Sequence, residues 1–342
     1  MEGCFGCGSA LNVIYFALRV RIPCIAIHKP WIQFWPGSHK REIVMENEHA
    51  AGPGKLSRLI AAPERPALLR GEIWIGPEVL SEAGFDQGPK GLVDFASSLG
   101  ADICFFHWPE SAMASDLREL VDLAHAARLD CGLTLNGPFQ RLTQTRNLID
   151  LLQELIRDPS TFKTGLAREM EEIAETLDLA KESEINLIVI TEDLAYTGGL
   201  YFSPQVFRTC LLPFYRVLLS RLSSTRIAVG WHSDGDVAPL LPDLVECGFR
   251  FFSLEPEGVD LLGFKRTYGS RVTLIGGIPT AWLVGEVMNE ERERECFREM
   301  NALTKEGGLI LASSTGLYSP KLLPNLKHLY RLANSITESR ES

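Results

Sequence analysis

The amino-acid sequence predicts an α/β fold, a (β/α)₈ TIM barrel at residues 63–342 that follows an N-terminal extension at residues 1–62. Two observations lead to this prediction. From about residue 63, short β-branched or aromatic runs alternate with longer stretches of helical period, which is typical of parallel βα units. Eight such units follow in series, and a closed barrel accommodates eight better than an open doubly wound sheet does.

The predicted strands are short apolar runs, as expected for strands that are buried on both faces. In chain order they are Glu72–Ile75, Asp102–His107, Cys131–Leu135, Leu187–Thr191, Ile227–Trp231, Phe251–Leu254, Val272–Ile275 and Leu309–Ala312.

Amphipathic segments of helical length separate these strands. The clearest are Leu117–Ala127, Leu148–Ile156, Leu166–Ala180, Val206–Leu222 and Val237–Cys247. Pro204 and Pro320 fall near the first turns of predicted helices, where a missing N–H costs little. Gly248 and Gly269 follow predicted helices and suit left-handed caps.

Composition narrows the class of protein. A length of 342 residues, with 45% hydrophobic and 23% charged residues, fits a globular protein with a full core. The net charge of -10 argues against a nucleic-acid partner, because too few cations are available to neutralise phosphates. No G-x-G-x-x-G follows the first predicted strand, so we expect no NAD.

The eight cysteines are scattered along the chain, several within apolar runs, which is typical of a reducing compartment. No uninterrupted apolar stretch reaches the roughly 18 residues that a membrane span needs. The start of the chain lacks the positive region of a secretory signal. We therefore expect a cytoplasmic protein with no membrane partner.

The extension at residues 1–62 has no clear helical or strand period. Cys4, Cys7, Cys24 and His28 have a spacing that is compatible with a zinc knuckle. The segment between them is long and apolar, however, and lacks the turns of a small zinc module. The sequence favours an extension that packs on the barrel.

Two carboxylates, Glu192 and Asp193, directly follow the fourth predicted strand. In a (β/α)₈ barrel, catalytic groups come from the carboxyl ends of the strands. Adjacent strand residues face opposite ways, so one of the two should point into the barrel mouth. We predict a catalytic role for the pair; the alternative is a helix cap or an ion pair with an arginine.

His232 and Asp234 follow the same logic at the end of the fifth predicted strand. Their i, i+2 spacing places both on one side, which suits a histidine–carboxylate hydrogen bond or two ligands of one metal ion. Here Asp236 is expected to cap the next helix. We predict His232 and Asp234 as catalytic residues, and His232, Asp234 and Glu255 as a metal-ligand set.

Further polar or aromatic residues follow the ends of the predicted strands, and we predict that they bind the substrate. They are His107, Asn136, Tyr196, Glu255, Ser314 and Tyr318.

Several short motifs in one order resemble the uroporphyrinogen decarboxylase superfamily over about residues 65–335. They are Asn136-Gly137-Pro138-Phe139, Asp158-Pro159, Glu192-Asp193, Ser203-Pro204, His232-Ser233-Asp234-Gly235-Asp236, Gly276-Gly277-Ile278 and Gly307-Gly308. That superfamily contains the decarboxylase of haem synthesis and cobalamin-dependent methyltransferases that serve coenzyme M. The resemblance independently implies a (β/α)₈ barrel.

Departures from the decarboxylase pattern favour the methyltransferase branch. The decarboxylases carry an arginine-rich segment that grips substrate carboxylates, where this chain offers Arg65 and Arg70 alone. They also carry a Gly-His-Gly where this chain has Ser314-Thr315-Gly316. An anionic substrate with many carboxylates needs several fixed cations.

In the zinc-dependent methyltransferases that the chain resembles, the His232 position reads His-x-Cys, with a second Cys near the end of strand eight. Here Asp234 stands at the first Cys position, and Ser313, Ser314 or Thr315 at the second. The resemblance therefore argues against a thiolate-bound zinc. A divalent metal on histidine and carboxylates, and metal-free acid–base chemistry by Glu192, Asp193 and His232, remain equal alternatives.

The resemblance implies a corrinoid-linked methyltransferase that acts on a small methylated substrate. The corrinoid would be carried by a partner protein, His232 and Asp234 would polarise the donor or acceptor, and Glu192 or Asp193 would accept a proton. One alternative is a uroporphyrinogen decarboxylase of tetrapyrrole biosynthesis. Another is a non-catalytic barrel that binds a tetrapyrrole or corrinoid. The sequence is also compatible with a homodimer.

Overall fold

The computed structural model describes residues 54–65, 67–108, 114–285, 288–305 and 307–341. The zinc-knuckle pattern of Cys4, Cys7, Cys24 and His28 lies outside the described residues, as does all but the end of the predicted extension.

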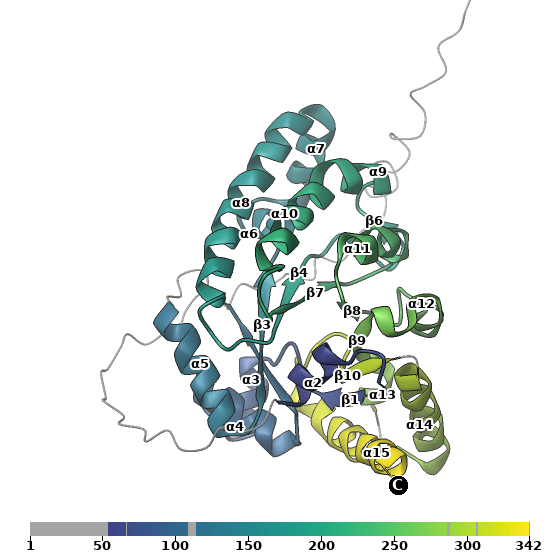
Figure 1. Ribbon diagram of the computed structural model, residues 1–342. Helices are drawn as coiled ribbons and strands as arrows, with labels where there is room; N and C mark the ends of the chain where they lie inside the picture. Colours follow the sequence, from purple (N-terminus) through teal and green to yellow (C-terminus); the bar gives the residue numbers. More distant parts are fainter. Residues whose placement is uncertain (1–53, 66, 109–113, 286–287, 306, 342) are drawn as a thin grey trace, which may run out of the picture. The chain divides into compact units, whose positions relative to one another are not determined.

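Eight parallel strands form a nearly closed barrel of the TIM type, which confirms the predicted fold class (Figure 1). Around the barrel the order is β1-β10-β9-β8-β7-β4-β3-β2. Strands β1 and β2 stand at the two ends of this order. Next to them, the Asp102 N–H donates to the Arg70 carbonyl at 2.8 Å, which links the two ends. The strands are β1 Ala67–Arg70, β2 Ile103–His107, β3 Asp130–Asn136, β4 Leu187–Thr191, β7 Ala228–Ser233, β8 Phe251–Leu254, β9 Thr273–Ile278 and β10 Gly308–Ser313. A short hairpin, β5 Ala195–Tyr196 with β6 Gly199–Leu200, follows β4.

Helices surround the strands. They are α2 Lys55–Ala61, α3 Pro77–Glu82, α4 Pro89–Leu99, α5 Ala114–Ala126, α6 Pro138–Thr145, α7 Leu148–Arg157, α8 Pro159–Ala180, α9 Pro204–Val206, α10 Leu212–Leu222, α11 Leu241–Cys247, α12 Leu261–Tyr268, α13 Thr280–Leu283, α14 Glu290–Lys305 and α15 Leu323–Glu341. A π-helical turn, Phe207–Leu211, joins α9 to α10 just before Pro213, whose ring and missing N–H disturb the regular α-helical ladder.

Seven predicted strands overlap observed ones, and Leu187–Thr191 and Phe251–Leu254 match at both ends. The first is wrong in position, because β1 spans Ala67–Arg70 and not Glu72–Ile75. Ala and Leu favour helix locally, and pairing with β10 overrides that preference. The β-branched Ile75 forms only an isolated bridge with Leu317.

The barrel has an inner core and an outer core, and successive strand residues alternate between them. On β4, Leu187 and Val189 belong to the inner core, while Ile188 and Ile190 pack against the helices. Helix α2 adds Leu56 to the inner core at the amino-terminal end of the strands. The Leu56 N–H donates to Asp130 Oδ2 at 2.9 Å, so this end is closed by packing and hydrogen bonding.

No helix in the described part of the chain combines the length and the apolar character needed to cross a membrane.

Candidate active site at the barrel mouth

The carboxyl ends of the strands carry a layer of polar side chains directly above the apolar inner core. The alternation that places Val189 inside also places Thr191 and Asp193 inside and sends Glu192 to the outer side. On β7 the same rule turns Trp231 outward and His232 inward. The polar layer is thus a consequence of strand register.

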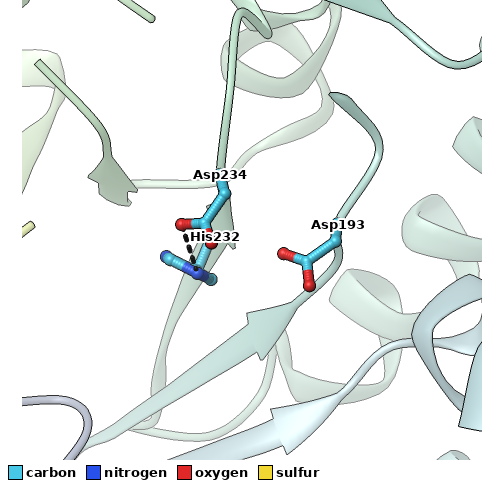
Figure 2. A group of neighbouring side chains, drawn as sticks. All are labelled: Asp193, His232 and Asp234. Carbon is cyan, nitrogen blue, oxygen red and sulfur yellow. Dashed lines mark ion pairs between the residues drawn. The ribbon is translucent and has the colours of Figure 1, made fainter. Parts of the chain in front are cut away.

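Asp193, His232 and Asp234 come together at the mouth, and we call these three residues the mouth cluster (Figure 2). Each residue offers one oxygen or nitrogen atom such that the three atoms lie within 4.8 Å of one another. His232 Nε2 and Asp234 Oδ1 are 3.5 Å apart. The side chain of His232 is 9% exposed and that of Asp234 49%, so the cluster reaches from the barrel wall to solvent.

Charge inside the mouth cluster perturbs Asp193. Burial raises the pKa of its carboxyl group, and the neighbouring Asp234 carboxylate raises it further, whereas His232 acts in the opposite direction. Two carboxylates held this close repel each other unless a proton or another cation lies between them. The mouth cluster is therefore a site where positive charge is needed.

Serine and threonine side chains of the polar layer hold its larger residues in place. His232 Nδ1 lies 3.0 Å from Ser253 Oγ, which leaves Nε2 facing Asp234. Across the barrel, His107 Nδ1 is 3.1 Å from Thr134 Oγ1. Such contacts fix the orientation of an imidazole ring.

His107 lies at the end of β2, and its ring packs against Trp74 with ring centroids 4.9 Å apart. Solvent reaches the side chain, but protein atoms crowd the ring, and this desolvation lowers its pKa to about 4. The ring is thus neutral near pH 7. Asn136 is buried at the end of β3, where its Oδ1 accepts from Thr191 Oγ1 at 2.9 Å.

Glu192 lies apart from the mouth cluster and is fully buried in the barrel wall. It accepts from the Tyr215 hydroxyl at 2.7 Å and from the Gln140 N–H at 2.8 Å. Burial raises the pKa of this carboxyl group to about 8, against the lowering effect of these hydrogen bonds. The N–H groups belong to the first turn of α6, where a helix terminus favours an acidic group.

The buried position of Glu192 explains the Asn136-Gly137-Pro138 motif at the end of β3. A Cβ atom at Gly137 would lie 2.4 Å from the carboxyl carbon of Glu192, so glycine makes room for the buried side chain. Pro138 then begins α6, where its missing N–H costs nothing.

The other predicted substrate residues surround the mouth in different settings. Glu255 accepts from the Gly235 N–H at 2.8 Å and so holds the loop that carries Asp234, rather than joining the mouth cluster. Tyr196 and Tyr318 are exposed. Ser314 is buried, and its hydroxyl has no hydrogen-bond partner among the described residues.

Sequence reasoning missed three groups that shape the site. Tyr201 stacks on Tyr196 with ring centroids 6.1 Å apart, and both Asp193 and Asp234 raise its pKa in addition to burial. Gln140 contacts both residues after β4, since its backbone N–H donates to the Glu192 carboxylate and its side chain accepts from the Asp193 N–H at 3.4 Å. Ser253 could have been found as a polar residue within an apolar strand.

A second buried carboxylate was missed as a site feature, although it falls inside the predicted first strand. Glu72 accepts from the Tyr330 hydroxyl at 2.8 Å and from the Ser313 N–H at 3.0 Å. Burial raises the pKa of Glu72. It repeats, just after β1 and with a tyrosine of α15, the carboxylate–tyrosine arrangement of Glu192 and Tyr215.

The family model of uroporphyrinogen decarboxylase (URO-D) matches residues 122–336, which include every residue of the mouth cluster. Among curated proteins, a methylcobamide:CoM methyltransferase, MtaA of Methanosarcina barkeri, is 24% identical over 198 residues, 57% of this chain and 55% of the relative. The chain thus spans about half the length of the curated relative that it matches.

Solved structures agree on the fold. A methyltransferase from Methanosarcina mazei superposes with a TM-score of 0.63 at 16% identity, covering 83% of this chain and all of the other. A D-allulose 3-epimerase from Methylomonas sp. has a TM-score of 0.52 at 14% identity, covering 81% of this chain and 99% of the other. At these identities the likeness shows the barrel and nothing about chemistry.

Proposed function

The chain belongs to the uroporphyrinogen decarboxylase family, and from that premise we propose that it is a corrinoid-linked methyltransferase. In this proposal a methyl group passes between a small molecule and a corrinoid that a partner protein carries. The observation that carries the proposal is the mouth cluster of Asp193, His232 and Asp234, which lies where (β/α)₈ enzymes hold their catalytic groups. The distant similarity to a methylcobamide:CoM methyltransferase supports the choice of reaction.

The charge of the mouth argues against decarboxylation of a polyanionic tetrapyrrole. Such a substrate needs fixed cations that pair with its carboxylates. In the described part of the chain, no lysine or arginine forms an ion pair with Asp193 or Asp234, and the carboxylate of Glu255 lies near enough to Asp234 for the latter to raise its pKa. An acidic mouth fits a neutral or cationic small molecule better.

The residues of the mouth fit a corrinoid presented from outside. Tyr196 and Tyr318 expose aromatic rings beside strand ends, where a broad apolar macrocycle can pack on them. When bound, a methylated corrinoid supplies a methyl-cation equivalent and keeps both electrons of the broken cobalt–carbon bond. The protein's own residues must then bind and activate the acceptor.

The mouth cluster activates the acceptor in this proposal. A thiol or hydroxyl attacks well only as its anion, so a site that stabilises the deprotonated atom lowers the barrier. His232 Nε2 and the Asp234 carboxylate face the opening, with the ring held from behind by Ser253. Ser314, a buried hydroxyl without a partner among the described residues, can donate to a bound substrate.

Glu192 acts as a positioning residue. It ties the N-terminus of α6 to the end of β4, and Gln140 of that helix also contacts Asp193. Through Gln140, Glu192 therefore helps to fix the position of Asp193. A positioning role supports geometry without requiring that Glu192 touch the substrate.

The test is demethylation of methylcobalamin, with coenzyme M as the first acceptor and a panel of small alcohols and thiols beside it, followed by cobalamin absorbance. We expect turnover by the intact protein and a loss of at least about 100-fold in His232→Ala. Asp236→Asn, which changes a half-buried carboxylate of the same loop outside the mouth cluster, is the matched control and should keep its rate.

Two other outcomes would assign a different function. Formation of coproporphyrinogen from uroporphyrinogen under anaerobic conditions would make the chain a decarboxylase. Saturable cobalamin binding without transfer to any acceptor would indicate a non-catalytic corrinoid-binding barrel.

A further inference from the structure

We propose that the side of the mouth opposite the mouth cluster binds a methylated ammonium group, so that the methyl acceptor is a thiol or alcohol that also carries such a cation. Trp74 and His107 form this surface, and we call them the aromatic side. The inference names the class of small molecule for the proposed function and rests on it.

The aromatic side lies across the barrel from the mouth cluster. Trp74 follows β1 and packs on the inner core, and His107 ends β2, where it continues the inward alternation of Ile103 and Phe105. Strand β7, which carries His232, is four strands away from β1 in either direction around the barrel. The interior of an eight-stranded barrel has room for side chains or one small ligand, so a bound molecule contacts both sides.

Trp74 is held in a fixed position by the loop that follows β10. Its carbonyl accepts from the Leu317 N–H at 2.8 Å. Two residues earlier, Glu72 accepts from the Ser313 N–H at 3.0 Å and joins the same two segments. Gly316 packs on Trp74, because its φ is 77° and a Cβ atom there would lie 2.6 Å from Trp74 Cβ. A surface that is fixed in advance binds a ligand with little loss of conformational entropy.

Aromatic faces attract cations that carry few N–H groups. The face of an indole ring bears partial negative charge, and a quaternary ammonium presents only methyl groups to it. The His107 ring widens this surface, and crowding lowers its pKa to about 4, so the imidazole does not repel a cation near pH 7. In the described part of the chain an arginine covers the ring of Tyr268, and no lysine or arginine covers that of Trp74.

The opposite wall supplies attraction over a longer distance. The Asp234 carboxylate raises the pKa of both Asp193 and Glu255, so the three acidic groups lie close together. A cleft lined by one sign of charge concentrates ions of the opposite sign. The carboxylates therefore attract any cation, whereas the aromatic side selects a methylated one. A primary ammonium is strongly hydrated and loses more when it leaves water for an aromatic face.

The two sides together orient the acceptor. With the ammonium group against Trp74, the thiol or hydroxyl of a short molecule extends toward His232 Nε2 and Asp234 Oδ1. Ser314 follows β10 in the loop that carries Gly316, and its buried hydroxyl has no partner among the described residues, so it is available to the same molecule. An anionic acceptor meets the carboxylates instead and is disfavoured.

The first experiment is calorimetric titration of the full-length protein with choline and with its uncharged analogue, in which a tert-butyl group replaces trimethylammonium. We expect one choline per chain, bound at least about 10-fold more tightly than the analogue. Trp74→Leu keeps an apolar side chain without an aromatic face and should reduce this preference about 10-fold, whereas Trp74→Phe should keep most of it. Tyr268→Leu, which removes an aromatic ring of α12 outside the mouth, is the matched control and should keep the full preference.

Circular dichroism shows whether each variant is folded, and choline should raise the thermal midpoint of the unchanged protein. Absence of saturable choline binding, equal affinity for choline and its uncharged analogue, or a preference that Trp74→Leu leaves unchanged would overturn the proposal. The comparison of the two ligands in the unchanged protein needs no variant, so it decides the question even if Trp74→Leu does not fold.

The second experiment separates this inference from the proposed function. Three acceptors share an ethanethiol skeleton and differ in charge, since thiocholine is cationic, mercaptoethanol neutral and coenzyme M anionic. We expect kcat/KM for methylcobalamin demethylation to fall in that order, by at least about 10-fold from first to last and mainly through KM. The reverse order would overturn the inference and leave the proposed function intact. Choline binding without transfer to any acceptor would contradict the proposed function alone.

Discussion

Glu192 and Asp193 are neighbours in the chain and carry the same functional group, yet they lie in opposite environments. Glu192 faces the barrel wall, where Tyr215 and the first turn of α6 satisfy its oxygens. Asp193 faces the mouth beside His232 and Asp234. One step along an extended chain therefore separates a carboxylate that holds the wall from one that is available to a ligand.

The comparison teaches that burial alone does not mark a catalytic carboxylate. Glu192 has its pKa raised to about 8, which by itself would suggest a proton-transfer role. Its oxygens are nevertheless used by protein donors. Glu72, which follows β1, repeats the pattern with Tyr330 and Ser313, well separated in sequence from the mouth cluster. Two such carboxylate–tyrosine pairs indicate a structural role in the barrel wall.

The largest expected effect is on stability at the wall. Glu192→Ala leaves the Tyr215 hydroxyl and the Gln140 N–H without their buried acceptor, and it should lower the free energy of unfolding by about 2–4 kcal/mol. Asp193→Ala removes a carboxylate from a repulsive cluster and should leave the free energy of unfolding unchanged or raise it slightly. Urea denaturation followed by circular dichroism measures both.

Two variants sharpen this result. Glu192→Gln keeps the volume and one carbonyl acceptor, so it should recover most of the loss. Tyr215→Phe removes a single hydrogen bond and should cost about 1–2 kcal/mol. Equal destabilisation by Glu192→Ala and Asp193→Ala would erase the distinction between wall and mouth.

The smallest expected effect is on the mouth side, where His107 should make the free energy of unfolding depend on pH. Crowding lowers the pKa of its ring from 6.5 to about 4 in the folded protein, so the unfolded chain binds the proton more readily. Stability from this group is therefore present above pH 6.5 and is lost as the pH falls toward 4. His107→Gln should lose this part of the dependence.

The measurement is the difference in unfolding free energy between His107→Gln and the unchanged protein across that pH range. The comparison with the variant is needed because other groups also make stability depend on pH. Asp193 and Glu255 have raised pKa values, so their contribution to stability falls as the pH rises, whereas that of His107 increases. A difference that is independent of pH would show that the ring is solvated like a free histidine.

Much of the fold could be predicted from the sequence, since eight apolar runs with helical segments between them allow few arrangements. The position of β1 could not, because Ala67-Leu68-Leu69 has no local preference for a strand and depends on pairing with β10. Glu72 falls within the displaced prediction, so its buried environment was missed with it.

The site was predictable in part for a related reason. The spacing of His232 and Asp234 places both on one side, and the structure brings them together. For Glu192 and Asp193 the alternation is certain, but both faces of β4 are apolar, so its pattern does not show which face is inside. The tyrosines that hold Glu192 and Glu72 lie on distant helices and have no local signal.

The most direct test of the account is the rate of methylcobalamin demethylation in Asp193→Asn against Glu192→Gln, each compared with the unchanged protein. The account predicts a loss of at least about 100-fold for Asp193→Asn and less than about 10-fold for Glu192→Gln, with both variants folded. The reverse order, with Glu192→Gln inactive and Asp193→Asn unimpaired, would contradict it.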